Sequence, residues 1–291
     1  MEKTGENRVK LAIAYDLLRF EEKALYNEAQ KLSVPVEMMH VDSLSFDLNT
    51  SDYIDRYDVL LQRCISHSRG LHVSAIFEAM GILAINSYEV SAICDDKLLT
   101  TLRLSRKGIP TPKTRVAFNQ EQALKALDEL GYPAVIKPIV GSWGRLVARV
   151  RDREEAAAVI ESRASGSNPN DHILYLQEYI KRPQRDIRAI VAGDELIATV
   201  YRYQPPNDWR TNVARGGTSE EAKLGDAERE ILLKAAEAVG GGILGIDAME
   251  GPSGIVVHEV NSTVEFRGAS TVSTNNIPRK MVEYALRVAK R

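Results

Sequence analysis

The first 90 residues alternate between apolar runs and helix-like segments, and this alternation restricts the fold more than any other feature of the chain. Three runs rich in apolar residues, at 9–16, 34–41 and 57–64, are separated by segments such as FEEKALYNEAQKL (20–32). Strand, helix and strand joined by short connections predict a parallel sheet covered by helices. We therefore expect a small α/β domain over residues 1–92. No G-x-G-x-x-G follows the first strand, so a dinucleotide is not its expected ligand.

A different pattern begins at residue 93 and predicts a second unit over 93–170. A helix is expected at 94–108, where Gly108 and the prolines at 110 and 112 end it. Two short strands, 132–139 and 144–150, are joined by the glycine-containing turn VGSWG. A helix over 153–164 and a buried strand over 172–180 follow.

The last third, 171–291, carries two further hairpin signals. Gly193-Asp194 separates one pair of apolar strands, and GPSG (251–254) separates the other. A helix over 226–239 lies between the hairpins, and a final helix starts at Pro278. Antiparallel hairpins with helices on one side predict an α+β body behind the parallel domain.

Composition and charge exclude several classes of function. No segment of the 291 residues approaches the roughly 20 apolar residues that span a bilayer. The N-terminus lacks the apolar core of a signal peptide, so we expect a cytoplasmic protein without a membrane partner. Cys64 and Cys94 have no companions at metal-ligand spacing. The formal net charge of −2 argues against general nucleic-acid binding.

The last hairpin places three oxygen donors where they can meet. Asp247 lies on one strand, and Glu259 and Asn261 lie two residues apart on its partner. Residues i and i+2 share a face, and a cross-strand neighbour can face the same way. Such a set of oxygens suits Mg²⁺, with water and phosphate oxygens completing its shell. The alternative is a solvated sheet face, which is the commoner explanation for a single acidic residue.

A metal that serves phosphates needs cations and backbone amides nearby. Lys137 interrupts the apolar strand VIKPI, where an unpaired ammonium is costly, so we expect an anionic partner. The loop Gly141-Ser142-Trp143-Gly144 that follows can bring N–H groups to phosphate oxygens. An ordinary turn is an equally good interpretation of the loop, and Lys97 by itself is typical of a surface helix.

The segment YQPPNDWRTNVARGG (203–217) is too polar for core and too long for a simple turn. It offers Arg210, Asn212 and Arg215, and long loops of this kind are often functional. Its arginines suit carboxylates or a transferred phosphoryl group. A solvated surface loop is the alternative.

The order DK…VIKP…GSWG…QEYI…RDIRA…WRTN…ARGG…GIDAME…HEVN resembles the ATP-grasp ligases of the RimK type from residue 9 onward. Within that family, GSWGRL, WRTNVARGG and EVNSTVEFRG resemble the branch that joins an amino acid to the amino-group carrier protein LysW. The resemblance implies an ATP-grasp fold behind an N-terminal parallel α/β (pre-ATP-grasp) domain. It also implies an ATP-dependent carboxylate–amine ligase.

The resemblance further implies a role for each motif. Lys97 and Lys137 would neutralise ATP phosphates beneath the loop of Gly141, Ser142, Trp143 and Gly144. Adenine contacts would come from the strand end Gln177, Glu178, Tyr179 and Ile180, and a ribose contact from Asp186. Asp247, Glu259 and Asn261 would bind two Mg²⁺ ions. The acyl phosphate and substrate carboxylates would be held by Arg202, Arg210, Asn212 and Arg215.

The implied reaction activates the side-chain carboxylate of the carrier's C-terminal glutamate as an acyl phosphate. The α-amino group of a free amino acid then attacks it, and such transfer depends on positioning and charge neutralisation. The stretch Glu265, Phe266 and Arg267 would form the amino-acid pocket, with Glu265 for the ammonium and Arg267 for a carboxylate. A simple salt bridge between Glu265 and Arg267 is the alternative.

Several choices stay open at this point. The motifs favour α-aminoadipate, while glutamate, or both amino acids, is the alternative because the two differ by one methylene. A RimK-like ligase that adds glutamate to a protein tail, or a nucleotide-binding module without activity, would share the phosphate residues. The implied carrier is small and acidic, so a basic path of Arg145, Arg149, Arg202 and Arg210 is expected. A homo-oligomer, a tetramer by resemblance, is also expected.

Overall fold

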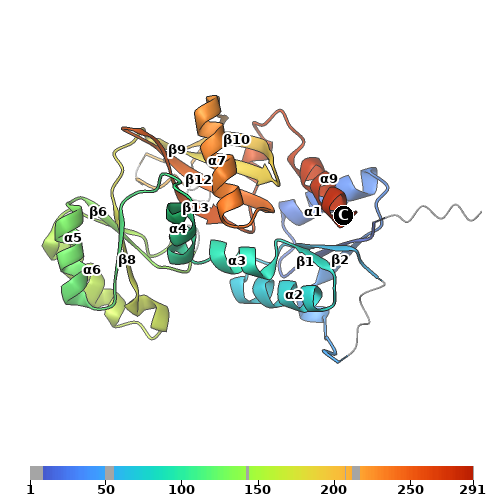
Figure 1. Ribbon diagram of the computed structural model, residues 1–291, viewed down its shortest axis with the longest axis horizontal. Coiled ribbons are helices and arrows are strands. Elements are labelled where there is room, and N and C mark those ends of the chain that lie inside the picture. Colours follow the sequence, from blue (N-terminus) through green and yellow to red (C-terminus); the bar gives the residue numbers. More distant parts are fainter. Residues whose placement is uncertain (1–8, 50–55, 142–143, 207, 212–216, 291) are drawn as a thin grey trace, which may run out of the picture.

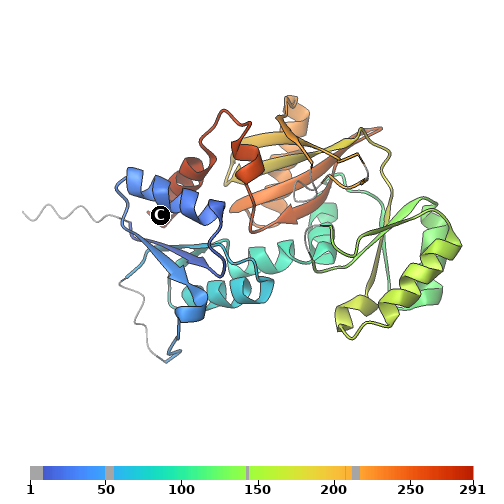
Figure 2. The ribbon, with the colours of Figure 1, turned by 180° about the vertical axis from the view of Figure 1, so that it is seen from behind.

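The computed structural model describes residues 9–49, 56–141, 144–206, 208–211 and 217–290, and within these ranges the strands form three sheets. The sheets follow one another along the long axis of the molecule, with the third sheet in the middle (Figures 1 and 2). None of the described helices is long and apolar enough to cross a membrane.

The N-terminal sheet has the strand order β2-β1-β3-β4 and is parallel throughout. Its strands are β1 (Leu11–Tyr15), β2 (Val36–His40), β3 (Val59–Gln62) and β4 (Leu83–Ile85). The helices of this unit are α1 (Phe20–Lys31), α2 (His67–Ala79) and α3 (Tyr88–Cys94), with a 3₁₀ turn at Val41–Ser43. The three predicted strands and their parallel arrangement are confirmed. β4 was not predicted, because three residues are too short for a periodic signal.

The central sheet has the order β5-β8-β6-β7 and is antiparallel. It contains β5 (Thr114–Ala117), β6 (Ala134–Lys137), β7 (Ala148–Val150) and β8 (Leu174–Glu178). Helices α5 (Gln120–Leu130) and α6 (Arg153–Ala164) pack against it around a shared apolar cluster, and a 3₁₀ turn at Pro169–His172 precedes β8. Together they form the lobe at the left of Figure 1.

The third sheet has the order β11-β10-β9-β12-β13. Its strands are β9 (Arg185–Ala192), β10 (Glu195–Tyr203), β11 (Ser219–Glu221), β12 (Ile243–Gly251) and β13 (Gly254–Asn261). Both predicted hairpins are present, β9 with β10 and β12 with β13. The remaining helices are α4 (Lys97–Arg106), α7 (Asp226–Ala238), α8 (Arg267–Ser270) and α9 (Ile277–Ala289).

Helices cover both faces of the third sheet, so the expectation of helices on one side was wrong. Ile187, Ala189 and Val191 of β9 belong to the core shared with α7 and the segment around α3 and α4. Ile190 and Ala192, which alternate with them, belong to the core that includes α1, α9 and the N-terminal strands. The alternation of side chains along a strand therefore gives each face its own core. The N-terminal unit therefore covers the second face of the sheet. The hairpin signals do not predict this, because they describe only neighbouring segments of the chain.

The predicted helix over 94–108 corresponds to α4, which is shorter, and Cys94 is the last residue of α3. Asp96 is the N-cap of α4, and its side chain accepts hydrogen bonds from the backbone of Leu98 (2.8 Å) and Leu99 (3.1 Å). A side-chain oxygen that satisfies the first free N–H groups of a helix fixes where the helix begins. α4 therefore starts at Lys97.

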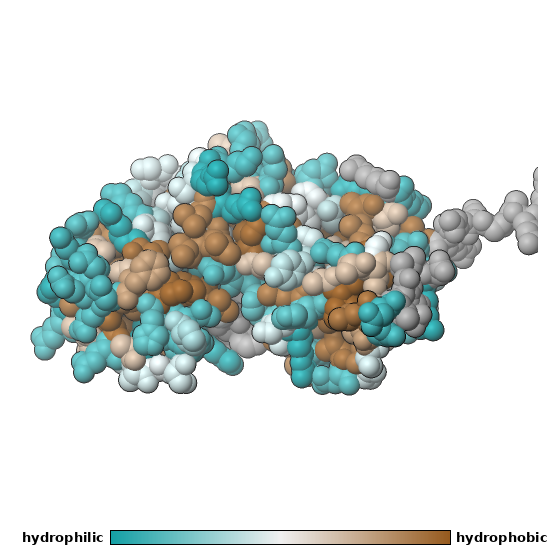
Figure 3. All heavy atoms as spheres, turned by 60° about the horizontal axis from the view of Figure 1, so that its bottom comes forward, coloured by the Kyte–Doolittle hydropathy of each residue, from teal (hydrophilic) through white to brown (hydrophobic). Residues whose placement is uncertain are grey.

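The sheets group the chain differently from the predicted units 1–92, 93–170 and 171–291. β8 pairs with β5 and β6 of the central sheet although it lies beyond residue 170. A division that follows the sheets falls after Glu178. The space-filling view in Figure 3 shows the surface hollowed between the lobe that carries α5 and α6 and the N-terminal end of the molecule.

Candidate active site

Two adjoining cavities lie among the three sheets. The larger, of about 900 Å³, is lined by residues of the N-terminal unit and of the third sheet. The smaller, of about 90 Å³, lies between the central sheet and the third sheet. Both are lined by the same five residues, Lys97, Gly141, Arg202, Asp247 and Glu259. We call these five residues the junction, because a group bound there faces both cavities.

Most residues predicted for nucleotide binding lie around the small cavity. The described ones all line it: Lys97, Lys137, Gly141, Gly144, Gln177, Glu178, Tyr179, Ile180 and Asp186. Ser142 and Trp143 lie outside the described residues. The pairing of β6 with β8 brings Lys137 beside the strand end that contains Gln177 and Glu178.

Lys137 is almost completely buried at the end of β6. Its Nζ donates to Gln177 Oε1 at 2.7 Å, so its direct partner is an amide oxygen and not the expected anion. Burial lowers the pKa of Lys137 to about 8, and the positive charge of Lys97 adds to this effect, whereas Glu259 and Asp247 oppose it. A buried ammonium that has no direct counterion among the described residues is suited to an anionic ligand.

Lys97 is also buried, although its sequence context is typical of a surface lysine. It is the first residue of α4, and its Nζ donates to Gly141 O at 2.6 Å and lies 3.6 Å from Glu259 Oε1. Gly141 and Gly144 have φ angles of 142° and 63°, which favour glycine. Lys97 therefore holds the start of the glycine loop against the junction.

The three predicted metal ligands lie on facing positions of β12 and β13. Asp247 is the cross-strand partner of Glu259, and Asn261 Nδ2 lies 3.5 Å from Asp247 Oδ2. Within the described residues, no group of three or more His, Cys, Asp and Glu side chains is placed to hold a metal. Two carboxylates and an amide oxygen still fit a hard cation that takes its other ligands from phosphate and water, as Mg²⁺ does.

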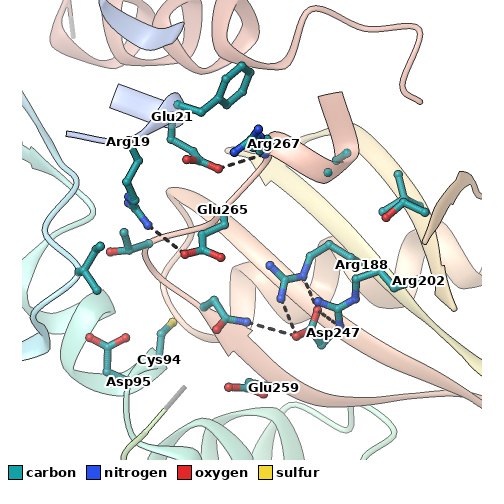
Figure 4. Close-up of a pocket in the computed structure, with 18 of the residues that line it drawn as sticks. Arg19, Glu21, Cys94, Asp95, Arg188, Arg202, Asp247, Glu259, Glu265 and Arg267 are labelled. Atoms are coloured by element: carbon teal, nitrogen blue, oxygen red, sulfur yellow. Dashed lines mark hydrogen bonds and ion pairs between the residues drawn. The ribbon is translucent and has the colours of Figure 1, made fainter. Parts of the chain in front are cut away.

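Arg188, which the sequence analysis did not select, binds Asp247 from β9. Its Nε and NH2 both donate to the carboxylate, with NH2 2.8 Å from Oδ2. Arg202 NH2 lies 3.0 Å from Oδ1 (Figure 4). Burial raises the pKa of Asp247, but the two guanidinium groups outweigh it and hold the pKa well below its usual range. Arg188 interrupts the apolar strand RDIRAIVA as Lys137 interrupts VIKPI, so the same sequence signal could have identified it.

Arg202 is buried rather than exposed on a basic path. It donates from Nε and NH2 to Asp186 at 2.8 Å each, in addition to its pairing with Asp247. Both Asp186 oxygens are thereby occupied, and Thr211 Oγ1 also donates to one of them. Asp186 lines the small cavity, and its ribose contact stays a prediction.

Arg210 reaches from its loop to the glycine loop. Its NH1 donates to Gly144 O at 2.9 Å, while Nε and NH2 donate to Asp208. Arg149 lies over the rings of Tyr179 (5.3 Å) and Trp209 (5.5 Å) beside the small cavity. Asn212 and Arg215 lie outside the described residues.

His258, which was also not predicted as a site residue, lines the small cavity. It lies between Val257 and Glu259 in the sequence. Burial lowers the pKa of His258 to about 3, and Lys137 adds to the effect. Its Nδ1 is buried without a hydrogen-bond partner among the described residues. The imidazole is therefore neutral at neutral pH.

The large cavity holds the predicted amino-acid residues together with side chains of the N-terminal unit. Glu265 Oε1 accepts from Arg19 NH1 at 2.9 Å, so its ion pair is with Arg19 and not with Arg267. Glu21 Oε1 accepts from the backbone N–H groups of Phe266 (3.2 Å) and Arg267 (3.1 Å). Figure 4 shows Arg19 and Glu265 pointing toward each other, on the side of the cavity opposite Asp247.

The two other residues of the predicted EFR stretch differ from each other. The Phe266 ring is fully buried and packs edge-on against Phe20, so it supports the segment and does not line the cavity. Arg267 lines the cavity, and its guanidinium has no partner among the described residues. Arg267 is thus the cation available to a carboxylate.

Comparison with known proteins agrees with this arrangement. The model of the RimK-like ATP-grasp domain matches residues 94–285, and the model of the LysX preATP-grasp domain matches residues 11–93. The chain belongs to the RimK-like ATP-grasp family, so the predicted family, the ATP-grasp fold and the ligase class are confirmed. This family binds ATP with Mg²⁺.

Curated relatives cover nearly the whole chain. The glutamate–LysW ligase ArgX of Sulfurisphaera tokodaii is 38% identical over 277 residues, 95% of this chain and 98% of the relative. The α-aminoadipate–LysW ligase LysX of the same organism is 38% identical over 280 residues, 95% of this chain and 96% of the relative. The chain is therefore as similar to a glutamate–LysW ligase as to an α-aminoadipate–LysW ligase.

Solved structures share the fold at low sequence identity. The RimK domain protein ATP-grasp of Sphaerobacter thermophilus has a TM-score of 0.75 at 22% identity, over 96% of this chain and all of the other. The ATP-grasp ligase PsnB, complexed with a minimal precursor, Mg and ADP, has a TM-score of 0.75 at 17% identity, over 97% of each chain.

Proposed function

We propose that this enzyme joins a free amino acid to the side-chain carboxylate of the C-terminal glutamate of a LysW-type carrier protein, with cleavage of ATP to ADP and phosphate through transfer of its γ-phosphoryl group to that carboxylate. The observation that carries the proposal is the junction. Lys97, Arg202, Asp247 and Glu259 line the cavity suited to a nucleotide and the cavity suited to substrates. The full-length likeness to ligases that act on LysW supports the choice of carrier.

Each side chain of the small cavity has a part in holding the nucleotide. Lys97 and Lys137 bind its phosphates beside Gly141 and Gly144, whose carbonyl oxygens accept hydrogen bonds from Lys97 and Arg210. The base lies near Tyr179 and the end of β8. Asp247, Glu259 and Asn261 would hold two Mg²⁺ ions, which would supply positive charge for the phosphate oxygens.

Transfer occurs at the junction, where Lys97 and Arg202 place positive charge beside Asp247 and Glu259. Arg188 and Arg202 lie beside Asp247, so they are placed to stabilise negative charge that develops as the γ-phosphoryl group moves to the carrier carboxylate. Arg267 binds a carboxylate of the amino acid in the large cavity. The amino group then displaces phosphate from the acyl phosphate.

We favour α-aminoadipate as the amino acid, because the STVE stretch (262–265) resembles the α-aminoadipate ligases. Glutamate is the second candidate, since the ArgX relative is as similar as the LysX relative. A homo-oligomer, a cytoplasmic location and the absence of nucleic-acid or membrane partners stay predictions.

Intact mass spectrometry of the carrier tests the proposal. The purified enzyme is mixed with ATP, Mg²⁺, a LysW-type carrier and either α-aminoadipate or glutamate. We expect the carrier to gain the mass of one aminoadipate residue. A gain of glutamate alone would assign the second candidate, and ATP binding without either gain would contradict the proposed function.

A further inference from the structure

His67 and Asp95 form a hydrogen-bonded pair in the wall of the large cavity. His67 is the first residue of α2, and Asp95 lies in the connection between α3 and α4. Asp95 Oδ2 lies 2.5 Å from His67 Nδ1, and Asp95 Oδ1 accepts from Ser262 Oγ at 3.0 Å. His67 and Asp95 both line this cavity, together with Glu259, Glu265 and Arg267. In Figure 4, Asp95 lies on the same side of the cavity as Glu259.

This arrangement fixes the tautomer of the imidazole. A carboxylate only accepts hydrogen bonds, so the proton of neutral His67 is on Nδ1 and the lone pair is on Nε2. Nε2 has no hydrogen-bond partner among the described residues. The His67 side chain is 35% exposed, so a proton taken up there can pass to water.

The proposed reaction requires a base at this place. The α-amino group of a free amino acid is an ammonium at neutral pH, and it has no lone pair until a proton leaves. The carboxylates that line the large cavity are already engaged: Asp247 with Arg188 and Arg202, Glu265 with Arg19, and Glu21 with two backbone amides. Glu259 faces Lys97 and is a proposed metal ligand.

We propose that His67 is the general base that deprotonates the attacking α-ammonium group, and that Asp95 and Ser262 are residues that position its ring. The proposal rests on the proposed function. Nε2 takes one proton from the ammonium, and the resulting amine forms a bond to the carbonyl carbon of the acyl phosphate. The bond from that carbon to the phosphate oxygen breaks, phosphate leaves with the electron pair, and it takes the second nitrogen proton.

The charges around His67 suit this role. The hydrogen bond that His67 donates to Asp95 raises the pKa of His67, burial opposes this, and Asp96 adds to the increase. Asp16 binds the backbone of Ile65 and Ser66 just before α2. Arg69, on the same helix, is paired with Asp42 at the surface. A base whose pKa lies near the working pH is the most effective.

A comparison of two nucleophiles distinguishes deprotonation of the amino acid by His67 from activation of the carrier. Hydroxylamine is largely unprotonated at neutral pH and traps an acyl phosphate without a base, whereas the amino acid must first lose a proton. His67→Gln should slow amino-acid ligation on the order of 10²- to 10⁴-fold, while carrier hydroxamate forms at nearly the wild-type rate. His72→Gln, an exposed histidine of the same helix, serves as the matched control and should change neither rate.

The pH profile gives a second readout. Wild-type ligation should level off above the pKa of His67, while ligation by His67→Gln should keep rising with pH as free amine accumulates. In Asp95→Asn, the rise of the ligation rate should occur at lower pH than in the wild type, because the carboxylate that raises the pKa of His67 is gone. A rise over the same pH range as in the wild type would overturn the role of Asp95 as a positioning residue.

The remaining outcomes are distinct. Unchanged ligation in His67→Gln, or an equal loss of ligation and of hydroxamate formation, would overturn the assignment of His67 as the base. Absence of carrier hydroxamate with the wild-type enzyme would instead overturn the proposed function itself, and the base assignment with it.

Discussion

At the scale of single residues, buried charges hold one another in place at the junction. Asp247 neutralises Arg188 and Arg202, which approach it from two neighbouring strands, and Arg202 has a second counterion in Asp186. Removal of one member of such a group leaves a buried charge without a partner, which costs about 3–5 kcal/mol. The residues that serve the chemistry therefore also stabilise the fold.

Asp247→Asn should lose both activity and stability. The amide cannot neutralise two guanidinium groups, so we expect the free energy of unfolding to fall by about 3 kcal/mol, and ligation to be lost. Urea unfolding and the carrier mass assay measure the two effects. Glu250→Gln is the matched control on the same strand, because its partner Arg185 is partly exposed, and a loss of about 1 kcal/mol or less is expected. Equal losses in the two variants would contradict the buried network.

Lys137 should make nucleotide binding depend on pH. Its pKa is lowered to about 8 in the free protein, and bound phosphates favour the charged form. Below pH 8 the ammonium is already present, whereas above it binding requires uptake of a proton, so affinity falls by up to about tenfold per pH unit. Calorimetric titration with ATP in the absence of Mg²⁺ measures this slope.

Lys137→Met should remove the slope and weaken binding by about 10- to 100-fold, the value of a hydrogen bond to a charged group. Lys113→Met changes an exposed lysine and should leave both affinity and slope unchanged. A pH-dependent affinity that survives in Lys137→Met would show that another group titrates.

The predicted site residues that line the two cavities break a local rule that is visible in the sequence. Lys137 stands in an apolar strand, and Asp247, Glu259 and Asn261 stand at face-sharing positions of a hairpin. The pairing of His67 with Asp95 has no such signal, because its two residues come from different units of the fold. The same applies to Arg19, which reaches Glu265 across 246 positions of sequence.

At the scale of elements, the N-terminus of α4 positions a functional side chain. Asp96 caps the helix, and the next residue, Lys97, donates its backbone N–H to Ile139 O at 2.8 Å beside the glycine loop. The sequence predicted a helix here but placed its start three residues too early, because CDDK offers two aspartates and only geometry selects the second. Element boundaries of this kind depend on the cap.

Asp96→Ala should destabilise the protein by about 1 kcal/mol, the usual cost of losing an N-cap, and should weaken ATP binding because Lys97 loses its fixed position. Asp152→Ala removes the matching cap of α6, where Asp152 accepts from Glu155 at 2.8 Å, away from both cavities. We expect similar unfolding free energies for the two variants and reduced nucleotide affinity only for Asp96→Ala. Reduced affinity in both would refute the local effect.

At the scale of the whole molecule, the large cavity exists because the N-terminal unit is fixed to the third sheet. Asn86 makes this connection from a buried position: its Nδ2 donates to Ile243 O (2.7 Å) and Ser262 O (2.6 Å), and its Oδ1 accepts from Ile243 N (2.7 Å). The parallel arrangement of the first strands and the hairpins of the later ones could be predicted from periodicity and turn signals. The packing of the units against each other could not, because it rests on contacts of this long-range kind.

Asn86→Ala should lower the free energy of unfolding by about 2–4 kcal/mol, since three buried hydrogen bonds are lost and their backbone partners stay buried. Asn275→Ala, which removes a single hydrogen bond to Ile197 O, should cost about 1 kcal/mol. Urea unfolding of both variants tests the difference. An Asn86→Ala variant as stable as Asn275→Ala would argue against this connection.

The most direct test of the account follows an oxygen atom through the junction. The carrier is prepared with ¹⁸O in the side-chain carboxylate of its C-terminal glutamate and is ligated with ATP, Mg²⁺ and the amino acid. Because the γ-phosphoryl group is transferred to that carboxylate before the amine attacks, we predict that the released phosphate contains one ¹⁸O atom per ligation. Ligation that leaves the label entirely on the carrier would contradict an acyl phosphate formed at Lys97, Arg202, Asp247 and Glu259.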